Sequence, residues 1–160
     1  MSSQGSPCSL CQKIADYQQR HADELVWEFA TSMVFLGTWQ YYEGYCVVTA
    51  KSHFTELFEV CPQDRHTLMD EVTLTAQAIH AVVKPRKINY EWLGNQMPHL
   101  HWHLFPRQES DPNHLQAVWL DIAKAEADAE LKKRWQSSIR GRTAIIKALK
   151  EQIRKLIGSA

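Results

Sequence analysis

Residues 99–105 (HLHWHLF) alternate histidine with large apolar side chains, and this alternation constrains the fold more than any other segment. It predicts a β-strand, because successive side chains of a strand point to opposite faces of the sheet. One face would carry three imidazole rings, those of His99, His101 and His103. The other face would be apolar and buried, with Leu100, Trp102 and Leu104. Imidazoles on a half-buried strand do not favour stability, since each ring needs hydrogen-bond partners, so the segment indicates a functional site.

The other segments predict a fold that combines an antiparallel sheet with helices. Short apolar runs predict strands at residues 25–30, 33–36, 45–50 and 88–93. Apolar residues at helical spacing predict helices at residues 9–20, 62–84, 117–137 and 145–157. Strands, one long helix, further strands and then helices favour the α+β class over a parallel βαβ fold.

Charge and hydropathy exclude several classes of protein. Lys and Arg total 18, as do Asp and Glu, so the formal net charge is zero. Residues 1–120 hold 8 basic and 13 acidic residues, whereas residues 121–160 hold 10 and 5. This balance argues against a nucleic-acid partner. No apolar run approaches the ~20 residues of a membrane helix, so we expect no membrane contact.

The N-terminus and the cysteines indicate the cellular compartment. Residues 1–7 are small and polar without an apolar signal core, so we expect a cytoplasmic protein. Four cysteines are too few for a disulfide scaffold in a chain of 160 residues. In a reducing compartment they would be thiols or metal ligands.

The residues alone leave three interpretations of the histidine cluster open. A solvated polar face that uses histidine by chance has a probability of roughly one in 10⁴ from the composition. A metal site is the second interpretation, because histidine is the commonest metal ligand. The third is nucleophilic catalysis, in which one neutral imidazole attacks phosphorus and its neighbours donate hydrogen bonds to phosphate oxygens and to the leaving group.

The pattern His-x-His-x-His with apolar spacers, followed by Pro106-Arg107, resembles the signature of the histidine triad (HIT) family of nucleotide hydrolases and transferases. Three further segments resemble family elements: residues 8–14 (CSLCQKI), 43–53 (EGYCVVTAKSH) and 117–119 (AVW). The resemblance covers residues 8–119, and it is strongest to bacterial hydrolases of the diadenosine tetraphosphate hydrolase type. It implies a five-stranded antiparallel sheet with helices, commonly paired into a homodimer.

The resemblance assigns a role to each histidine of the triad. His101 would be the nucleophile that attacks the α-phosphorus of a nucleoside phosphate and forms a nucleotidyl-histidine, which water then hydrolyses. His103 would contact the phosphate and help the leaving group, and its presence favours hydrolysis over transfer to a second phosphate. His99 would orient the neighbouring groups.

Further residues are implied to bind substrate. Gln96 and Asn89 fall near the positions of the family's phosphate-side polar residues. Arg107 ends the triad strand, where it would meet either a substrate phosphate or a carboxylate across a dimer. The sequence departs from the family at two positions, because Tyr45 stands where a histidine is common and Asn95 where a glutamine is usual.

The pair Cys8 and Cys11 has the spacing of half a zinc site. The resemblance to zinc-bearing bacterial HIT proteins supplies His53 and His99 as the other half. Such a site would be structural and would leave His101 free. Two thiols without a metal are the alternative, and we expect no organic cofactor.

The sequence therefore predicts a HIT domain at residues 1–119. A C-terminal helical extension at residues 120–160 would pack on the same domain or on a dimer partner. The expected function is hydrolysis at the α-phosphorus of a dinucleoside polyphosphate or a nucleoside phosphoramidate. The alternatives are a nucleotide-binding regulatory protein with little turnover and a histidine-rich metalloenzyme.

Overall fold

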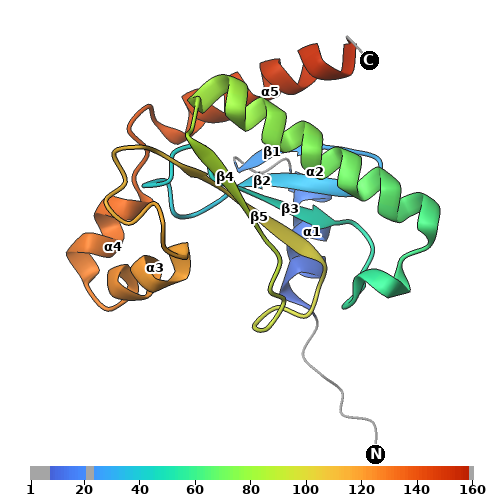
Figure 1. Ribbon diagram of the computed structural model, residues 1–160. Coiled ribbons are helices and arrows are strands. Elements are labelled where there is room, and N and C mark those ends of the chain that lie inside the picture. Colours follow the sequence, from blue (N-terminus) through green and yellow to red (C-terminus); the bar gives the residue numbers. More distant parts are fainter. Residues whose placement is uncertain (1–7, 21–23, 159–160) are drawn as a thin grey trace, which may run out of the picture.

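The computed structural model describes residues 8–20 and 24–158. Its centre is a five-stranded antiparallel sheet with helices on both faces (Figure 1). The strands are β1 (Leu25–Glu28), β2 (Ser32–Leu36), β3 (Cys46–Ala50), β4 (Lys87–Glu91) and β5 (His101–Arg107). They lie in the order β1-β2-β3-β5-β4. The expected α+β class and antiparallel sheet are confirmed. The polar N-terminus, residues 1–7, lies outside the described residues.

Helices α2 (Pro62–Val83) and α5 (Arg142–Gly158) cover one face of the sheet (Figure 1). The short 3-10 helix η1 (Leu57–Glu59) precedes α2. Lys84 ends α2 with a φ of 52°, because Pro85 disfavours the helical conformation at the residue before it. The main hydrophobic core lies between these helices and the sheet, and it includes Val48, Trp102, Leu104, Ile79 and Leu149.

The opposite face carries α1 (Ser9–Arg20), α3 (Val118–Glu126) and α4 (Ala129–Gln136). Two smaller apolar clusters hold these helices. Ile14 and Tyr17 of α1 pack on β2. Val118 and Ile122 of α3 pack against Phe105 of β5. The face under α2 and α5 is therefore mainly apolar, with a buried hydrogen bond from Ser32 to Glu71 as its polar contact. The opposite face is covered only in part, by two separate helical units.

Two segments differ from the sequence-based expectation. β5 begins at His101 rather than at residue 99, because the chain turns before it: the N–H of His99 donates to the carbonyl of Met97 over 2.8 Å. The expected helix at residues 117–137 is divided into α3 and α4. Asp128 separates them, because its carboxylate accepts hydrogen bonds from two backbone N–H groups in the first turn of α4.

The basic C-terminal part packs on the acidic body of the same chain. Arg140 forms an ion pair with Glu43 over 3.2 Å, and Arg142 forms one with Glu24 over 3.5 Å. The expected domain boundary after residue 119 falls inside α3. Among the described residues, no helix is both long enough and apolar enough to span a bilayer.

Candidate active site and metal centre

A pocket of about 580 Å³ lies on the partly covered face of the sheet, a size within the usual range for small-ligand sites. Its floor comes from β3 and β5, and its walls come from α1, α3 and the loop before His99. Of the six residues expected to act on or bind substrate, three line this pocket: His101, His103 and Gln96. His99, Asn89 and Arg107 are not part of its lining.

His101 is buried and begins β5. Its Nδ1 lies 2.6 Å from the backbone carbonyl oxygen of His99. A carbonyl only accepts hydrogen bonds, so Nδ1 must carry the hydrogen, and the neutral ring then has its lone pair on Nε2. The histidine therefore presents a nucleophilic nitrogen in the pocket.

His103 lies two residues further along the same face of β5 and has different partners. Its Nδ1 lies 2.6 Å from the hydroxyl of Tyr45, and the edge of Trp119 packs against its ring at a centroid distance of 5.0 Å. Burial, together with the nearby charge of His101, lowers the pKa of His103 to about 4. His103 is therefore a neutral ring near pH 7.

His99 does not share the orientation of the other two histidines. Its Nε2 donates a hydrogen bond of 2.7 Å to the carbonyl of Ala50, which leaves the Nδ1 lone pair free. That Nδ1 lies 3.4 Å from the Cys8 sulfur, 3.5 Å from the Cys11 sulfur and 3.2 Å from Nδ1 of His53. The four candidate ligand atoms lie within 4.8 Å of one another. The structure therefore brings the four expected metal ligands together.

This cluster fits a tetrahedral zinc ion. Bond lengths of about 2.0 Å to nitrogen and 2.3 Å to sulfur place tetrahedral ligands about 3.3–3.8 Å apart, which is close to the separations in the cluster. A hydrogen bond from the far nitrogen to a carbonyl, as in His99, is the usual support of a zinc-bound histidine. Burial and the neighbouring Cys8 raise the pKa of the Cys11 thiol, and a divalent cation would reverse that effect by stabilising the thiolate.

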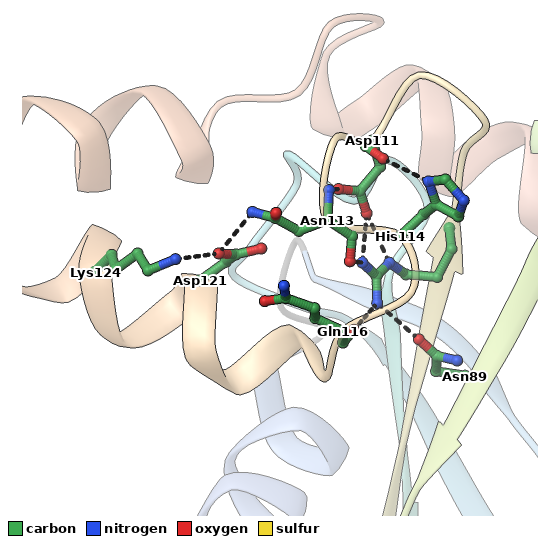
Figure 2. Close-up of polar contacts among 8 residues, drawn as sticks. Asn89, Asp111, Asn113, His114, Gln116, Asp121 and Lys124 are labelled. Carbon is green, nitrogen blue, oxygen red and sulfur yellow. Dashed lines mark hydrogen bonds and ion pairs between the residues drawn. The ribbon is translucent and has the colours of Figure 1, made fainter.

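Arg107 lies at the other end of β5, where its side chain is buried. Figure 2 shows the polar network at this end of the strand, with Asn89, Asp111 and Asn113 labelled. The Arg107 Nε donates to Asp111 over 2.7 Å, and its Nη2 lies 2.6 Å from the same carboxylate oxygen. Nη1 donates to the Asn89 side chain over 3.0 Å and to the Gln116 carbonyl over 2.7 Å, and Nη2 also donates to the Asn113 carbonyl over 2.7 Å. These contacts occupy all five donors of the guanidinium, and neither Arg107 nor Asn89 is among the residues that line the pocket.

The same network extends to α3 (Figure 2). The Asn113 side chain donates to Asp121 over 3.0 Å, and Lys124 donates to the same carboxylate oxygen over 3.0 Å. Arg107 thus ties α3 to the end of β5, next to the pocket.

Sequence reasoning missed several residues that line the pocket. They are Ile122, Ala123 and Glu126 of α3 and Leu10 and Lys13 of α1. Only the short motif at residues 117–119 pointed to α3, because the rest of that helix carries an ordinary amphipathic pattern. Lys13 is ion-paired with Glu24 over 3.2 Å.

A family model described as the HIT domain matches residues 18–110, which is more than half of the chain. The chain belongs to the HIT domain family. This places the protein in a superfamily of nucleotide-binding proteins and hydrolases. Cys8, Cys11 and helices α3–α5 lie outside the residues that this family model matches. No curated protein is significantly similar to this HIT protein.

Solved structures of HIT proteins share the fold. A hypothetical histidine triad nucleotide-binding protein from Sulfolobus tokodaii is 20% identical with a TM-score of 0.65, covering 90% of this chain and 93% of that one. A zinc-bound histidine triad family protein from Mycobacterium smegmatis is 14% identical with a TM-score of 0.67, covering 96% and 98%. A HIT-like protein involved in cell-cycle regulation from Bartonella henselae is 14% identical with a TM-score of 0.65, covering 94% and 99%.

Proposed function

We propose that this HIT protein hydrolyses a nucleoside phosphate at its α-phosphorus through a nucleotidyl intermediate on His101. The observation that carries the proposal is the hydrogen bond between His101 Nδ1 and the His99 carbonyl, because it leaves the Nε2 lone pair as the nucleophile. The substrate is a dinucleoside polyphosphate, such as diadenosine tetraphosphate, or a nucleoside phosphoramidate.

The reaction has two steps. The Nε2 lone pair of His101 forms a bond to the α-phosphorus, and the bond from phosphorus to the leaving group breaks with its electron pair going to that group. A water oxygen then attacks the phosphorus, the electron pair of the N–P bond returns to Nε2, and the water proton passes to solvent. His103 donates a hydrogen bond that stabilises the charge developing on phosphate.

The lining of the pocket supports a nucleotide ligand. Trp39 and Trp119 offer flat apolar surfaces for a base, and Gln96 offers an amide for phosphate. Thr49 Oγ1 is buried beside the triad and has no hydrogen-bond partner within the described part of the chain. We assign Asn89 and Arg107 to the support of α3 instead of to substrate binding.

Replacement of the nucleophile tests this function. His101→Asn should abolish hydrolysis of an adenosine polyphosphate panel, whereas His80→Asn, on the exposed surface of α2, should leave it unchanged. Unchanged hydrolysis in the His101 variant would refute the covalent mechanism.

We further propose that zinc is bound by Cys8, Cys11, His53 and His99. When bound, the ion supplies a structural cross-link between α1 and the segment that leads into β5. A metal bridging the triad lacks support, because the His99 ring faces the cysteines. Metal analysis tests this assignment: metal lost from Cys8→Ser/Cys11→Ser protein supports it. Metal retained there but lost in His101→Ala would place the ion on the triad.

We also propose that the protein is a homodimer and is located in the cytoplasm. β4 is an edge strand, and the side chains of Tyr90, Trp92 and Leu93 are exposed on it and directly after it. Such an edge can pair with the same strand of a second copy to give a continuous sheet. None of the four described cysteines is in a disulfide, and thiols or metal ligands are compatible with the proposed reducing compartment. Light scattering of the purified chain should give twice the monomer mass, and a monomer would refute the dimer.

A further inference from the structure

Tyr45 is the hydrogen-bond partner of His103, at the position where the sequence departs from the family. The side chain is buried, and its hydroxyl lies 2.6 Å from His103 Nδ1. The ring stacks on Phe105 at a centroid distance of 3.9 Å. The partner nitrogen is Nδ1, so Nε2 is the nitrogen of His103 that remains for substrate in the pocket.

The surrounding chain is shaped to hold this ring. A Cβ at Gly37 would lie 2.2 Å from two ring atoms of Tyr45, so any larger residue there would displace the ring. The Tyr45 carbonyl accepts hydrogen bonds from the Gly37 N–H over 2.8 Å and from the Gln40 side chain over 3.0 Å. The hydroxyl therefore has a fixed place beside His103.

The direction of the hydrogen bond follows from counting donors and acceptors. If Nδ1 of His103 carried the hydrogen, the Tyr45 O–H would be buried without an acceptor among the described residues. An unsatisfied buried hydroxyl is unfavourable, so the hydroxyl donates and Nδ1 accepts. Burial raises the pKa of Tyr45, so the phenol keeps its hydrogen. The ionisable groups near the pair are His101, which contacts the His103 ring, and Glu91, which pairs with His103 across the sheet. Cys46 lies next to Tyr45 in the chain, and its side chain belongs to the core on the other face of the sheet.

We propose that Tyr45 holds His103 as the tautomer with hydrogen on Nε2. His103 then donates a hydrogen bond to the substrate but gives up no proton. The enzyme therefore prefers phosphoanhydride substrates to phosphoramidate substrates. This inference rests on the proposed function. If His103 released its Nε2 proton, Tyr45 would have to supply another to Nδ1 and remain as a buried phenolate, which is strongly unfavourable.

Because His103 cannot supply a proton, the leaving group must be one that departs without being protonated. When a phosphoanhydride P–O bond breaks, the electron pair stays on a phosphate oxygen, which is a weak base and departs as an anion without a proton. When a phosphoramidate P–N bond breaks, the electron pair stays on nitrogen, which is strongly basic and needs a proton as it departs. The remaining acids of the lining are Lys13, paired with Glu24, and Glu126.

The tautomer can be measured independently of activity. In ¹⁵N-histidine-labelled full-length protein, long-range ¹H–¹⁵N spectra at neutral pH should show His103 with hydrogen on Nε2 and none on Nδ1. Tyr45→Phe should shift this equilibrium. Tyr42→Phe is the matched control, because its buried hydroxyl has no partner within the described residues. Hydrogen on Nδ1 in the wild type, or an unchanged Tyr45→Phe spectrum, would overturn the proposal.

Kinetics test the substrate preference. The kcat/KM for diadenosine tetraphosphate should exceed that for adenosine 5′-phosphoramidate by about a hundredfold or more, and Tyr45→Phe should lower the former about tenfold. Efficient phosphoramidate hydrolysis that forms adenylyl-His101, or that depends on Glu126, would overturn the inference and leave the proposed function standing. Turnover of neither substrate would overturn the proposed function and the substrate preference together, while the tautomer result would stand on its own spectra.

Discussion

The two ends of the pocket are held by different chemistry. At one end, Cys8 and Cys11 at the start of α1 meet His53 after β3 and His99 before β5. We propose that a metal ion joins these two thiols and two imidazoles. At the other end, α3 is joined to the last residue of β5 through Arg107, whose donors all have partners within the chain. The triad strand is thus anchored at both ends, by the proposed zinc site and by a permanent network.

Because of this difference, only one end of the pocket should change when metal concentration or pH changes. The α3 end forms whenever the chain folds, because every charge in it is compensated internally. With zinc bound as proposed, the α1 end depends on a metal ion and on deprotonated ligands. We therefore expect metal removal to loosen α1 and the pocket wall that it contributes, while α3 stays in place.

Removal of the metal should have the largest effect. Structural zinc supplies on the order of 10 kcal/mol in small zinc peptides, so chelation or Cys8→Ser/Cys11→Ser should lower the Tm by about 10 °C or more. Calorimetry measures this change, with Cys61→Ser, an exposed free thiol, as the control. An unchanged Tm after complete demetallation would show that both ends are held without an ion.

Loss of the arginine should have the next largest effect. Arg107→Met leaves the Asp111 carboxylate buried without its cation, which typically costs about 3–5 kcal/mol of the free energy of unfolding. Arg86→Met is the control, because its ion pair with Glu109 is exposed and worth about 0–1 kcal/mol. Urea unfolding that shows equal small losses for both variants would contradict the role of the network.

Low pH should lower the free energy of unfolding through His103, which lies on β5 between the candidate zinc site and the Arg107 network. The folded-state pKa of His103 is about 4 against an ordinary 6.5, so between these values the unfolded chain binds a proton that the folded chain excludes. Stability should therefore fall as the pH decreases from 6.5 to 4, and His103 accounts for up to about 3 kcal/mol of the loss. His103→Asn should flatten this slope and His80→Asn should not, as measured by urea unfolding at several pH values.

The contact of α4 should be the weakest of the attachments. Tyr41 stacks on Trp135 at a centroid distance of 4.2 Å and an interplanar angle of 7°, but its ring is 38% exposed. Tyr41→Ala should lower the free energy of unfolding by about 1 kcal/mol, as expected for one exposed aromatic pair. A loss as large as that of Arg107→Met would mean that the α3–α4 unit is held mainly by stacking.

The sequence predicted what depends on local pattern and missed what depends on tertiary contacts. Alternation identified the strand that carries His101 and His103, and cysteine spacing with the family resemblance identified the metal cluster. The turn before His101 was not predicted, because backbone hydrogen bonds between distant segments hold it in addition to the local bond from the His99 N–H to the Met97 carbonyl. One example is the 2.8 Å bond from the Leu100 N–H to the Phe54 carbonyl.

Arg107 illustrates the same limit. A positive charge that follows three histidines indicates a phosphate contact when only neighbours in the sequence are considered. In the fold, the loop at residues 111–116 returns over the end of β5 and supplies three of the acceptors for this side chain, and Asn89 of β4 supplies the fourth. The contribution of α3 to the pocket depends on that loop, and beyond the motif at residues 117–119 it has no local signal.

The central claim, that His101 is the nucleophile, is tested most directly by trapping the intermediate. The full-length protein is mixed rapidly with diadenosine tetraphosphate, quenched with denaturant, and analysed by peptide mass spectrometry. We expect an adenylyl group on His101, absent in His101→Asn and present in His80→Asn. An adduct on another residue, or continued turnover by His101→Asn without an adduct, would contradict it.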